Sequence, residues 1–470
     1  MKASDEEQKP KEESQPVMES AAVQPTNYEQ EDDQPEQDGI LEKLKGDRIG
    51  ETMYSERFVL TTILKLPQLK TSLADDEDFE KDLCSLWDMT IEKDVVLFLL
   101  KHDVVELFVG LSENSQDYRL MEILFGIIGN MCCVDETHKC LYENKSLLMS
   151  LCAFLESSDT LVLVQLMRII TSLLDRSDDE QYCWFKLFRE IEGMTDKLGF
   201  ILSSTTNKEL IEHTVEAVHA MVNRFTEAEV DYAQLNEFYS IFAKPSLIEG
   251  LMEGFKQVYP ETAAENKFEE EYLTSKDLKT IQKFLEIHEN LIINANEAYT
   301  NYVEKIVYCM WRVLVPLSGE SSLLPLSKMH VRIFVSINSI YSAIVYHFHA
   351  ETFLALVKIY TLLSKEQEAI QKNATNQESS TADDKEETED CEFDIQTALG
   401  EILETLYFTA EPIDLSTIEN TWKASCFSEP IVERLCSAIR GTMAGDPLLE
   451  RTCNLLMEGA RNVWSKKDRS

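Results

Sequence analysis

Apolar residues recur every three or four positions over most of this chain, which is the pattern of amphipathic helices. Beyond the first forty residues, one such segment follows another with short polar breaks between them. The strict alternation of apolar and polar residues that is typical of half-buried strands is scarce. The pattern therefore predicts an all-α protein. In its second half, helices are expected over residues 278–293, 302–315, 331–348, 353–363, 393–408 and 431–444.

Two of the apolar segments have matching registers. Residues 121–131 and 163–173 align at an offset of 42 (163 minus 121), and a weaker third copy around residues 215–221 follows after a further 49 or so. Armadillo and HEAT units repeat at about 40–47 residues. One unit cannot bury its apolar face alone, so neighbouring units stack into a continuous core. The sequence thus predicts an armadillo/HEAT-like α-solenoid, a right-handed superhelix with a concave surface.

Polar segments divide the chain. Residues 1–40 are rich in Glu, Asp, Gln and Pro and nearly lack large apolar residues, so we expect a disordered acidic tail. Residues 364–392 have a similar composition and are expected to form a disordered acidic loop. The helical repeats would then occupy residues 41–363, and C-terminal helices over 393–465 would continue the solenoid. A short acidic cluster at residues 75–78 is expected to open a helix, where negative charge meets the positive end of the helix dipole.

The charge balance restricts the partners. The chain has 44 Lys and Arg against 85 Asp and Glu, a formal net charge of -41. Such a surface repels phosphate backbones and anionic lipid headgroups, so we expect neither nucleic acid nor membrane as a direct partner. A protein with basic segments would be attracted. The same charge can also serve solubility alone, and both interpretations stay open.

Cysteine usage and the absence of targeting signals bear on the compartment. The eleven cysteines are irregularly spaced and mostly lie inside apolar runs, which is typical of buried thiols in a reducing compartment. The N-terminus has neither the apolar run of a secretory signal nor the basic character of a mitochondrial presequence. No uncharged apolar run reaches the roughly 18 residues that span a bilayer. We therefore expect a soluble cytosolic or nuclear protein.

Candidate chemistry is sparse. Cys132, Cys133, His138 and Cys140 carry the ligand types that hold Zn²⁺, but adjacent cysteines on a helix point about 100° apart and the paired C-x₂-C arms are missing. Core cysteines at a helix end, with His138 in the turn that follows, explain the cluster better. No nucleophile elbow, phosphate loop or metalloprotease motif occurs. We therefore expect no enzymatic activity, no cofactor and no metal.

Three segments carry a family resemblance: residues 46–55 (GDRIGETMYS), residues 86–99 (LWDMTIEKDVVLFL) and residues 126–131 (GIIGNM). In these segments the chain resembles the serum amyloid A-like protein family, over roughly residues 46–135. The resemblance implies an armadillo-like scaffold that is found in the nucleus, is linked to cell proliferation and has no enzyme activity. Trp87, within the second segment, falls in the apolar register of a helix and is interpreted as a packing residue.

Candidate binding residues follow from the repeat. In peptide-carrying armadillo proteins, an asparagine on the third helix of each repeat bonds the backbone of an extended peptide. Asn130 has this place here, but the next copy has Ser172, and the tryptophan of the carrier pattern is replaced by Gly126. Asn130 can therefore bond either a neighbouring loop or a ligand. We take Asn130, Ser172 and Asn223 as candidates for partner binding in the groove.

Together these observations predict a non-enzymatic protein-interaction scaffold in the nucleus, with the cytoplasm as a second location. The alternative is an acidic carrier or chaperone for basic nuclear proteins, in which the acidic segments mimic phosphates. The two hypotheses differ in where the affinity resides, in the helical groove or in the acidic segments.

Overall fold

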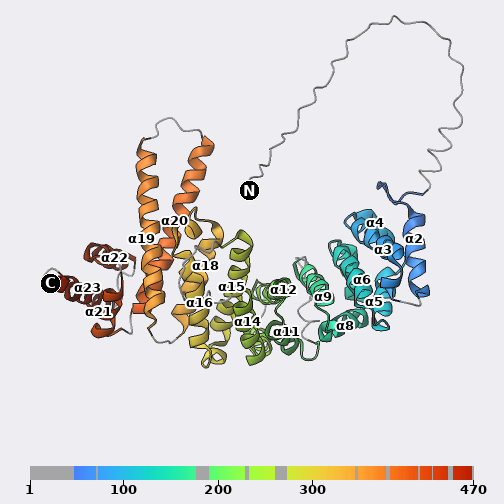
Figure 1. The fold of residues 1–470 in the computed structure, drawn as a ribbon, viewed down its shortest axis with the longest axis horizontal. Helices are drawn as coiled ribbons and strands as arrows, with labels where there is room; N and C mark the ends of the chain where they lie inside the picture. The colour runs from blue at the N-terminus through green and yellow to red at the C-terminus, as the bar shows by residue number, and fades with distance from the viewer. Residues whose placement is uncertain are drawn as a thin grey trace, which may run out of the picture. The chain divides into compact units, whose positions relative to one another are not determined.

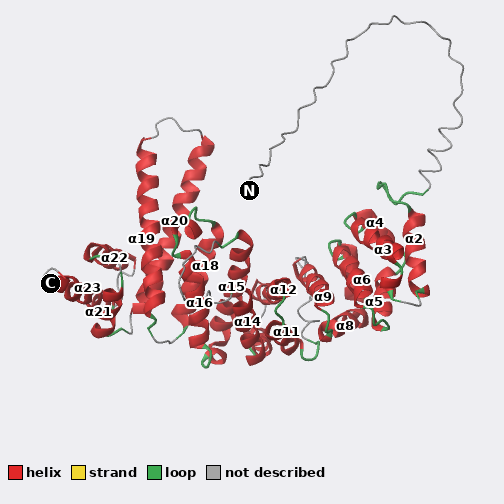
Figure 2. Ribbon diagram, viewed as in Figure 1, coloured by secondary structure: helices red, strands yellow, loops and turns green. Residues whose placement is uncertain are grey.

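A computed structural model describes residues 47–69, 72–175, 190–227, 232–259, 273–344, 348–376, 382–410, 413–425, 427–442 and 448–467. The chain divides into two units, Met1–Arg48 and Ile49–Ser470, and only Asp47 and Arg48 of the first are described. The acidic tail predicted for residues 1–40 lies outside the described residues. In the described part of the second unit every regular element is a helix (Figure 2), so the prediction of an all-α protein is confirmed.

One set of helices forms a continuous row, in which each helix packs on the next. We call it the first row, and Figure 1 shows its members following one another along the chain. It consists of α3 (Glu77–Met89), α6 (Tyr118–Met131), α9 (Thr160–Asp175), α12 (Lys208–Glu227), α15 (Ser275–Tyr299), α18 (Lys328–Ala343) and α20 (Ala382–Ala410). The matching segments predicted from sequence lie on α6, α9 and α12, three neighbours in this row.

A second row of helices covers the first. Its members also pack on one another, with the 3₁₀ helix η3 (Phe154–Glu156) bridging α8 and α11, and the arrangement is compatible with a helical solenoid. The buried apolar side chains of both rows belong to one hydrophobic cluster. The second row consists of α5 (Val104–Glu113), α8 (Lys145–Ala153), α11 (Met194–Ser204), α14 (Pro245–Val258), α16 (Val303–Leu317) and α19 (Ala350–Asn376).

The remaining elements flank these rows. They are α2 (Glu56–Lys65), η1 (Leu66–Gln68), η2 (Leu73–Asp75), α4 (Lys93–Leu100), α7 (Asp135–Glu143), α13 (Tyr232–Phe242), α17 (Glu320–Leu323), α21 (Leu415–Ala424), α22 (Glu429–Thr442) and α23 (Leu449–Lys467). Helix α23 packs on α20, α21 and α22. The helices predicted for the second half of the chain are all present, with boundaries that differ by a few residues or, in α19 and α20, by a longer extension.

Local signals fix several helix starts. Asp76 caps α3, and its carboxylate accepts a hydrogen bond from the Phe79 amide at 3.1 Å, so the acidic cluster at 75–78 opens a helix as predicted. Asp117 caps α6 in the same way and also accepts from the Leu73 amide at 2.6 Å, which ties η2 to the first row. Burial alone would raise the pKa of Asp117, but these hydrogen bonds outweigh it and lower the pKa.

Two glycines permit a close approach of α11 and α14 in the second row. A β-carbon on Gly250 of α14 would lie 2.4 Å from the Gly199 carbonyl oxygen of α11, and one on Gly199 would lie 2.3 Å from the Ser246 oxygen. Because main-chain atoms cannot move aside as a side chain does, only glycine fits at both positions. In the first row, Gly126 makes room in the same way for the Trp87 indole, which confirms that Trp87 is a packing residue.

The structure differs from the sequence prediction over residues 364–392. Helix α19 continues to Asn376 and α20 begins at Ala382, where a disordered loop was expected, and residues 377–381 lie outside the described part. The segment is rich in Ala, Glu, Lys and Gln, which are good helix formers, and contains neither Gly nor Pro. Lys372 also pairs with Glu368 one turn earlier, at 3.6 Å. Polar composition alone therefore did not distinguish a solvated helix from a loop.

Candidate functional site

Polar side chains connect neighbouring helices along the first row. Asn130 on α6 donates to the Trp87 carbonyl and to the Thr90 hydroxyl, both at 3.2 Å, and its own oxygen accepts from Arg168 of α9 at 3.4 Å. The sequence left open whether Asn130 bonds a neighbour or a ligand, and the structure gives it intramolecular partners on both sides. Ser172 lies partly exposed on α9.

Asn223, the third candidate, lies on α12 and faces α15. Its amide is 2.9 Å from the His219 Nε2 atom, and its oxygen accepts from Asn290 at 3.2 Å. Asn290 on α15 and Asn338 on α18 are two further amide side chains that connect helices of the first row. Sequence reasoning missed both, because the contacts between α12 and α15 and between α18 and α20 join residues 63–69 apart in the chain rather than 42–49.

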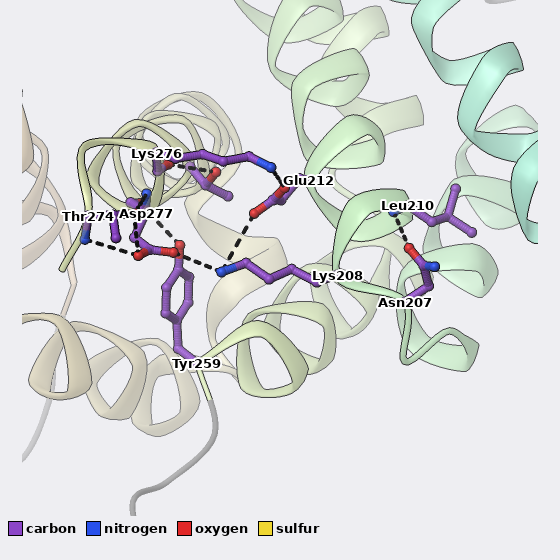
Figure 3. Close-up of polar contacts among 9 residues, drawn as sticks. Asn207, Lys208, Leu210, Glu212, Tyr259, Thr274, Lys276 and Asp277 are labelled. Atoms are coloured by element: carbon purple, nitrogen blue, oxygen red, sulfur yellow. Dashed lines mark hydrogen bonds and ion pairs between the residues drawn. The ribbon is translucent and has the colours of Figure 1, made fainter. Parts of the chain in front are cut away.

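The starts of α12 and α15 form a compact polar cluster, drawn in Figure 3. Lys208 Nζ lies 2.9 Å from Asp277 and 3.8 Å from Glu212, while Lys276 Nζ is 2.6 Å from the other Glu212 oxygen. Thr274 and Asp277 form a capping box at the start of α15, and the Tyr259 hydroxyl donates to the Asp277 carbonyl at 3.1 Å. Two ammonium groups thus meet two carboxylates, and the cluster is electrically balanced.

Further along the same interface, each carboxylate again has a basic partner. Glu216 of α12 contacts Lys283 of α15 and lies 3.5 Å from His213 Nδ1. The hydrogen bond from His213, supported by Lys283, lowers the pKa of Glu216 to about 2 against the effect of burial. Glu286 of α15 accepts from His219 at 2.6 Å. Burial would raise the pKa of Glu286, but the hydrogen bonds from His219 and Gln282 lower it.

The interface of α15, α18 and α20 is different. Three half-buried carboxylates, Glu289, Glu401 and Glu404, gather around Asn338 and Ser336, and we call them the carboxylate cluster. Asn338 donates to Glu401 at 2.8 Å and to Glu404 at 2.9 Å, while the Ser336 hydroxyl donates to Glu289 at 2.6 Å. Within the described part of the chain, none of the three forms an ion pair. Neutral donors alone hold a site of formal charge -3.

The unmatched negative charge of the carboxylate cluster affects the pKa of Glu401. Burial raises its pKa, the hydrogen bond from Asn338 lowers it, and the charges of Glu404 and Glu289 raise it further, so the net shift is upward. Asn338 is only 8% exposed and also accepts a hydrogen bond from the Thr405 hydroxyl at 3.3 Å. The Asn338 amide is therefore fixed in place between Glu401 and Glu404, but it does not neutralise their negative charge.

The cysteine and histidine cluster is separate from this row of contacts. Cys132 is buried and Cys133 is exposed. His138 does not lie in a turn, as the sequence suggested, but inside α7, where it is 2% exposed and its Nε2 atom lies 2.8 Å from the Cys132 carbonyl oxygen. The prediction failed because Asp135 and Glu136 occupy the first turn of α7 rather than a loop. Among the described residues no group of His, Cys, Asp or Glu is arranged to hold a metal ion.

A hollow of about 640 Å³ lies between the turn before α9 and the helix α11. Leu155, Leu163 and Leu210 contribute to its lining, Phe200 is 69% exposed beside them, and the rim carries serine and threonine hydroxyls. Its charged residues have partners of opposite sign, Glu156 with Lys197 at 3.0 Å and Asp196 with Lys244 at 3.2 Å. The hollow contains no set of nucleophile, base and orienting residue.

Comparisons with known proteins agree with the resemblance seen in the sequence. No family model matches the chain. The chain is 28% identical to zebrafish "Protein saal1" over 242 residues, which are 48% of this chain and 51% of the relative. It is 32% identical to human "Protein SAAL1" over 186 residues and to the mouse protein of the same name over 190 residues, in each case 37% of this chain and 39% of the relative.

Homologues of this all-helical chain are thus SAAL1 proteins, at about 30% identity over 37–48% of its length. The alignments cover about half or less of the relatives. Among solved structures, an engineered protein aligns over 85% of this chain and 99% of its own with 16% identity and a TM-score of 0.34, which is too low to support an argument about the fold. In the described part of the chain, no helix combines the length and apolar character needed to cross a membrane.

Proposed function

We propose that this chain is a non-enzymatic protein-interaction scaffold of the SAAL1 type, with an armadillo-like repeat architecture and a nuclear role linked to cell proliferation. Its partner would carry a basic segment that lies along the first row. The observation that supports this most strongly is the carboxylate cluster of α15, α18 and α20. Three carboxylates held by neutral donors would accept a lysine or arginine side chain, because a partner cation would supply the missing countercharge.

The net charge of -41 also favours a partner with a basic segment. A strongly acidic protein attracts basic segments over a range of about one Debye length, roughly 8–10 Å at physiological salt, and short-range contacts then select the partner. The half-buried cluster would provide these contacts. In contrast, the α12–α15 interface already has its own lysines and histidines, so a basic partner would gain less there.

The test is proximity labelling in cells with the wild-type chain and the Glu401→Gln/Glu404→Gln double variant. Glu433→Gln/Glu458→Gln is the matched control, because it removes the same charge from exposed positions on α22 and α23. We expect the partner set to survive in the control and to lose its basic members in the cluster variant. Equal partner sets for all three chains would contradict the proposal.

The acidic carrier is the second candidate, and the composition of residues 1–40 favours it. The tail deletion separates the two functions: a carrier would lose basic nuclear proteins when residues 1–40 are removed, while a scaffold would retain them. Asn or Gln substitutions at Asp383, Asp384, Glu386 and Glu387 extend this test to the second acidic segment without shortening α20.

A further inference from the structure

Two cysteines meet in the last helical pair of the chain. Cys436 lies on α22 and Cys453 on α23, 17 residues apart, and both side chains are fully buried. The Cys436 Sγ atom is 3.7 Å from the Cys453 carbonyl oxygen, and the Cys453 Sγ atom is 3.8 Å from the Cys436 carbonyl oxygen. Each sulfur therefore rests against the main chain of the other cysteine. Packing alone does not need two facing thiols here, since any two small apolar residues would fill the space.

We propose that Cys436 and Cys453 are a disulfide site, which closes under oxidising conditions and fastens α23 to α22. The reciprocal contacts put the two side chains in the space between the same two residues, which is where a disulfide lies. This site is separate from the carboxylate cluster and is independent of the proposed partner binding.

The electrostatic surroundings favour one of the two sulfurs as the nucleophile. A hydrogen bond from Cys436 lowers the pKa of Cys453, and the nearby Arg440 guanidinium lowers it further against the effect of burial. The same thiol contact raises the pKa of Cys436. Arg440 is held in place by Glu450, at 3.2 Å and 3.3 Å. The positive charge of Arg440 lies on the side of Cys453, so we take Cys453 as the attacking sulfur in the proposed reaction.

A peroxide would oxidise the pair in two steps. The Cys453 thiolate attacks one peroxide oxygen, the O–O bond breaks, and a sulfenic acid and hydroxide form. The Cys436 sulfur then attacks the Cys453 sulfur, the S–O bond breaks, and water leaves with the Cys436 proton. Both sulfurs are oxidised and the peroxide is reduced. The oxidant would reach the buried pair through local opening of α23, whose main packing partners among the described helices are α21 and α22.

The test is made on the full-length chain. Protein is treated with hydrogen peroxide, free thiols are blocked with N-ethylmaleimide, and disulfides are mapped by non-reducing peptide mass spectrometry. We expect a linked peptide pair containing Cys436 and Cys453 that disappears with dithiothreitol. Closing a ring of this size should also slow amide hydrogen exchange in α23 by about 100-fold.

Two variants accompany the wild type. Cys436→Ser should leave a sulfenic acid on Cys453, trapped by dimedone, and no link. Cys309→Ser is the matched control, because Cys309 is an equally buried thiol on α16 with no cysteine among the groups that shift its pKa, and it should leave the link intact. If Cys436→Ser does not fold, the peptide map of the oxidised wild-type chain still tests the proposal. Free Cys436 and Cys453 under conditions that oxidise the exposed Cys133, or a link that forms only in urea, would overturn the proposal.

Discussion

The α12–α15 interface and the α18–α20 interface are built from the same elements, two long helices of one row with half-buried polar residues between them. They differ in charge. In the first, Glu216 and Glu286 each meet a basic side chain of this chain. In the second, Glu401 and Glu404 meet an asparagine. One helical row is thus neutral at one interface and keeps unmatched charge at another, without a change of fold.

This difference has a consequence for stability as well as for binding. A carboxylate with a lowered pKa stabilises the folded state at neutral pH, whereas one with a raised pKa is charged at some cost to the fold. A charge that destabilises the fold is typical of sites where that charge has a function. We therefore interpret the first interface as structural and the second as functional, and the following experiments test that division.

The largest expected effect concerns partner binding. Glu401→Lys/Glu404→Lys reverses two charges of the carboxylate cluster, and we expect the affinity for a basic partner identified by labelling to fall about 100-fold. The same reversal at the exposed pair Glu433 and Glu458 should change it only a few-fold, because exposed charges are screened. The measurement is a titration calorimetry series at two salt concentrations. Equal losses in the two variants would mean that net charge, and not the cluster, attracts the partner.

The next largest effect is on local stability around Asn338. Asn338→Ala removes the donor shared by Glu401 and Glu404, and we expect the free energy of opening of α18 and α20 to fall by about 2 kcal/mol at pH 7. Hydrogen exchange measures this locally, which suits a long chain that need not unfold in one step. Asn290→Ala is the control in the other interface and should cost about 1 kcal/mol or less, since the oxygen of its partner Asn223 keeps access to water. A larger loss of opening free energy for Asn290→Ala than for Asn338→Ala would contradict the assignment of the α12–α15 interface as structural and the α18–α20 interface as functional.

A somewhat smaller effect is expected at Glu216. Its folded pKa of about 2 lies below the unfolded value near 4.5. The stability that it contributes is therefore present above about pH 4.5 and is lost as the pH falls toward 2. Allowing for partial exposure, Glu216→Gln should lower the opening free energy of α12 and α15 by about 1–2 kcal/mol at pH 7 and by much less near pH 2. A loss that is independent of pH would point to packing instead of charge.

The smallest effect is predicted for the tail. Removal of residues 1–40 should change the affinity for the basic partner less than about 3-fold at physiological salt, because a polar tail acts through screened, long-range attraction. Surface plasmon resonance with both chains gives the affinity and the association rate, and only the rate should respond clearly to salt. A loss of most of the affinity would favour the acidic carrier instead.

Much of the fold could be predicted from the sequence, since the spacing of apolar residues determines which helix faces are buried. The copies at 121–131 and 163–173 lie on neighbouring helices because matching registers bury matching faces. The helices within residues 364–392 were missed because a solvated helix and a disordered loop have the same polar composition. The absence of Gly and Pro from this segment was the signal that favoured helix. His138 was misplaced because acidic residues fit both a turn and the first turn of a helix.

The candidate site was less accessible to sequence reasoning. Asn130 and Asn223 were found because they follow the first repeat spacing, and both have intramolecular partners. Asn338 was missed because the spacing lengthens between α18 and α20, and nothing in the sequence places Glu401 and Glu404 beside it. A search for asparagines on each apolar helix would have found Asn338, but the unmatched charge around it is a property of three helices together.

The most direct test of the division is the stability of Glu401→Gln. The raised pKa of Glu401 means that the protonated form is favoured in the folded state, so its stabilising effect is present below the unfolded pKa and is lost as the pH rises through the folded pKa. At pH 7, replacing the carboxylate by a neutral amide should leave the opening free energy of α18 and α20 unchanged or raise it by about 0.5 kcal/mol. A loss of about 1 kcal/mol or more, as expected for Glu216→Gln, would show that the carboxylate stabilises its own interface and would contradict the account.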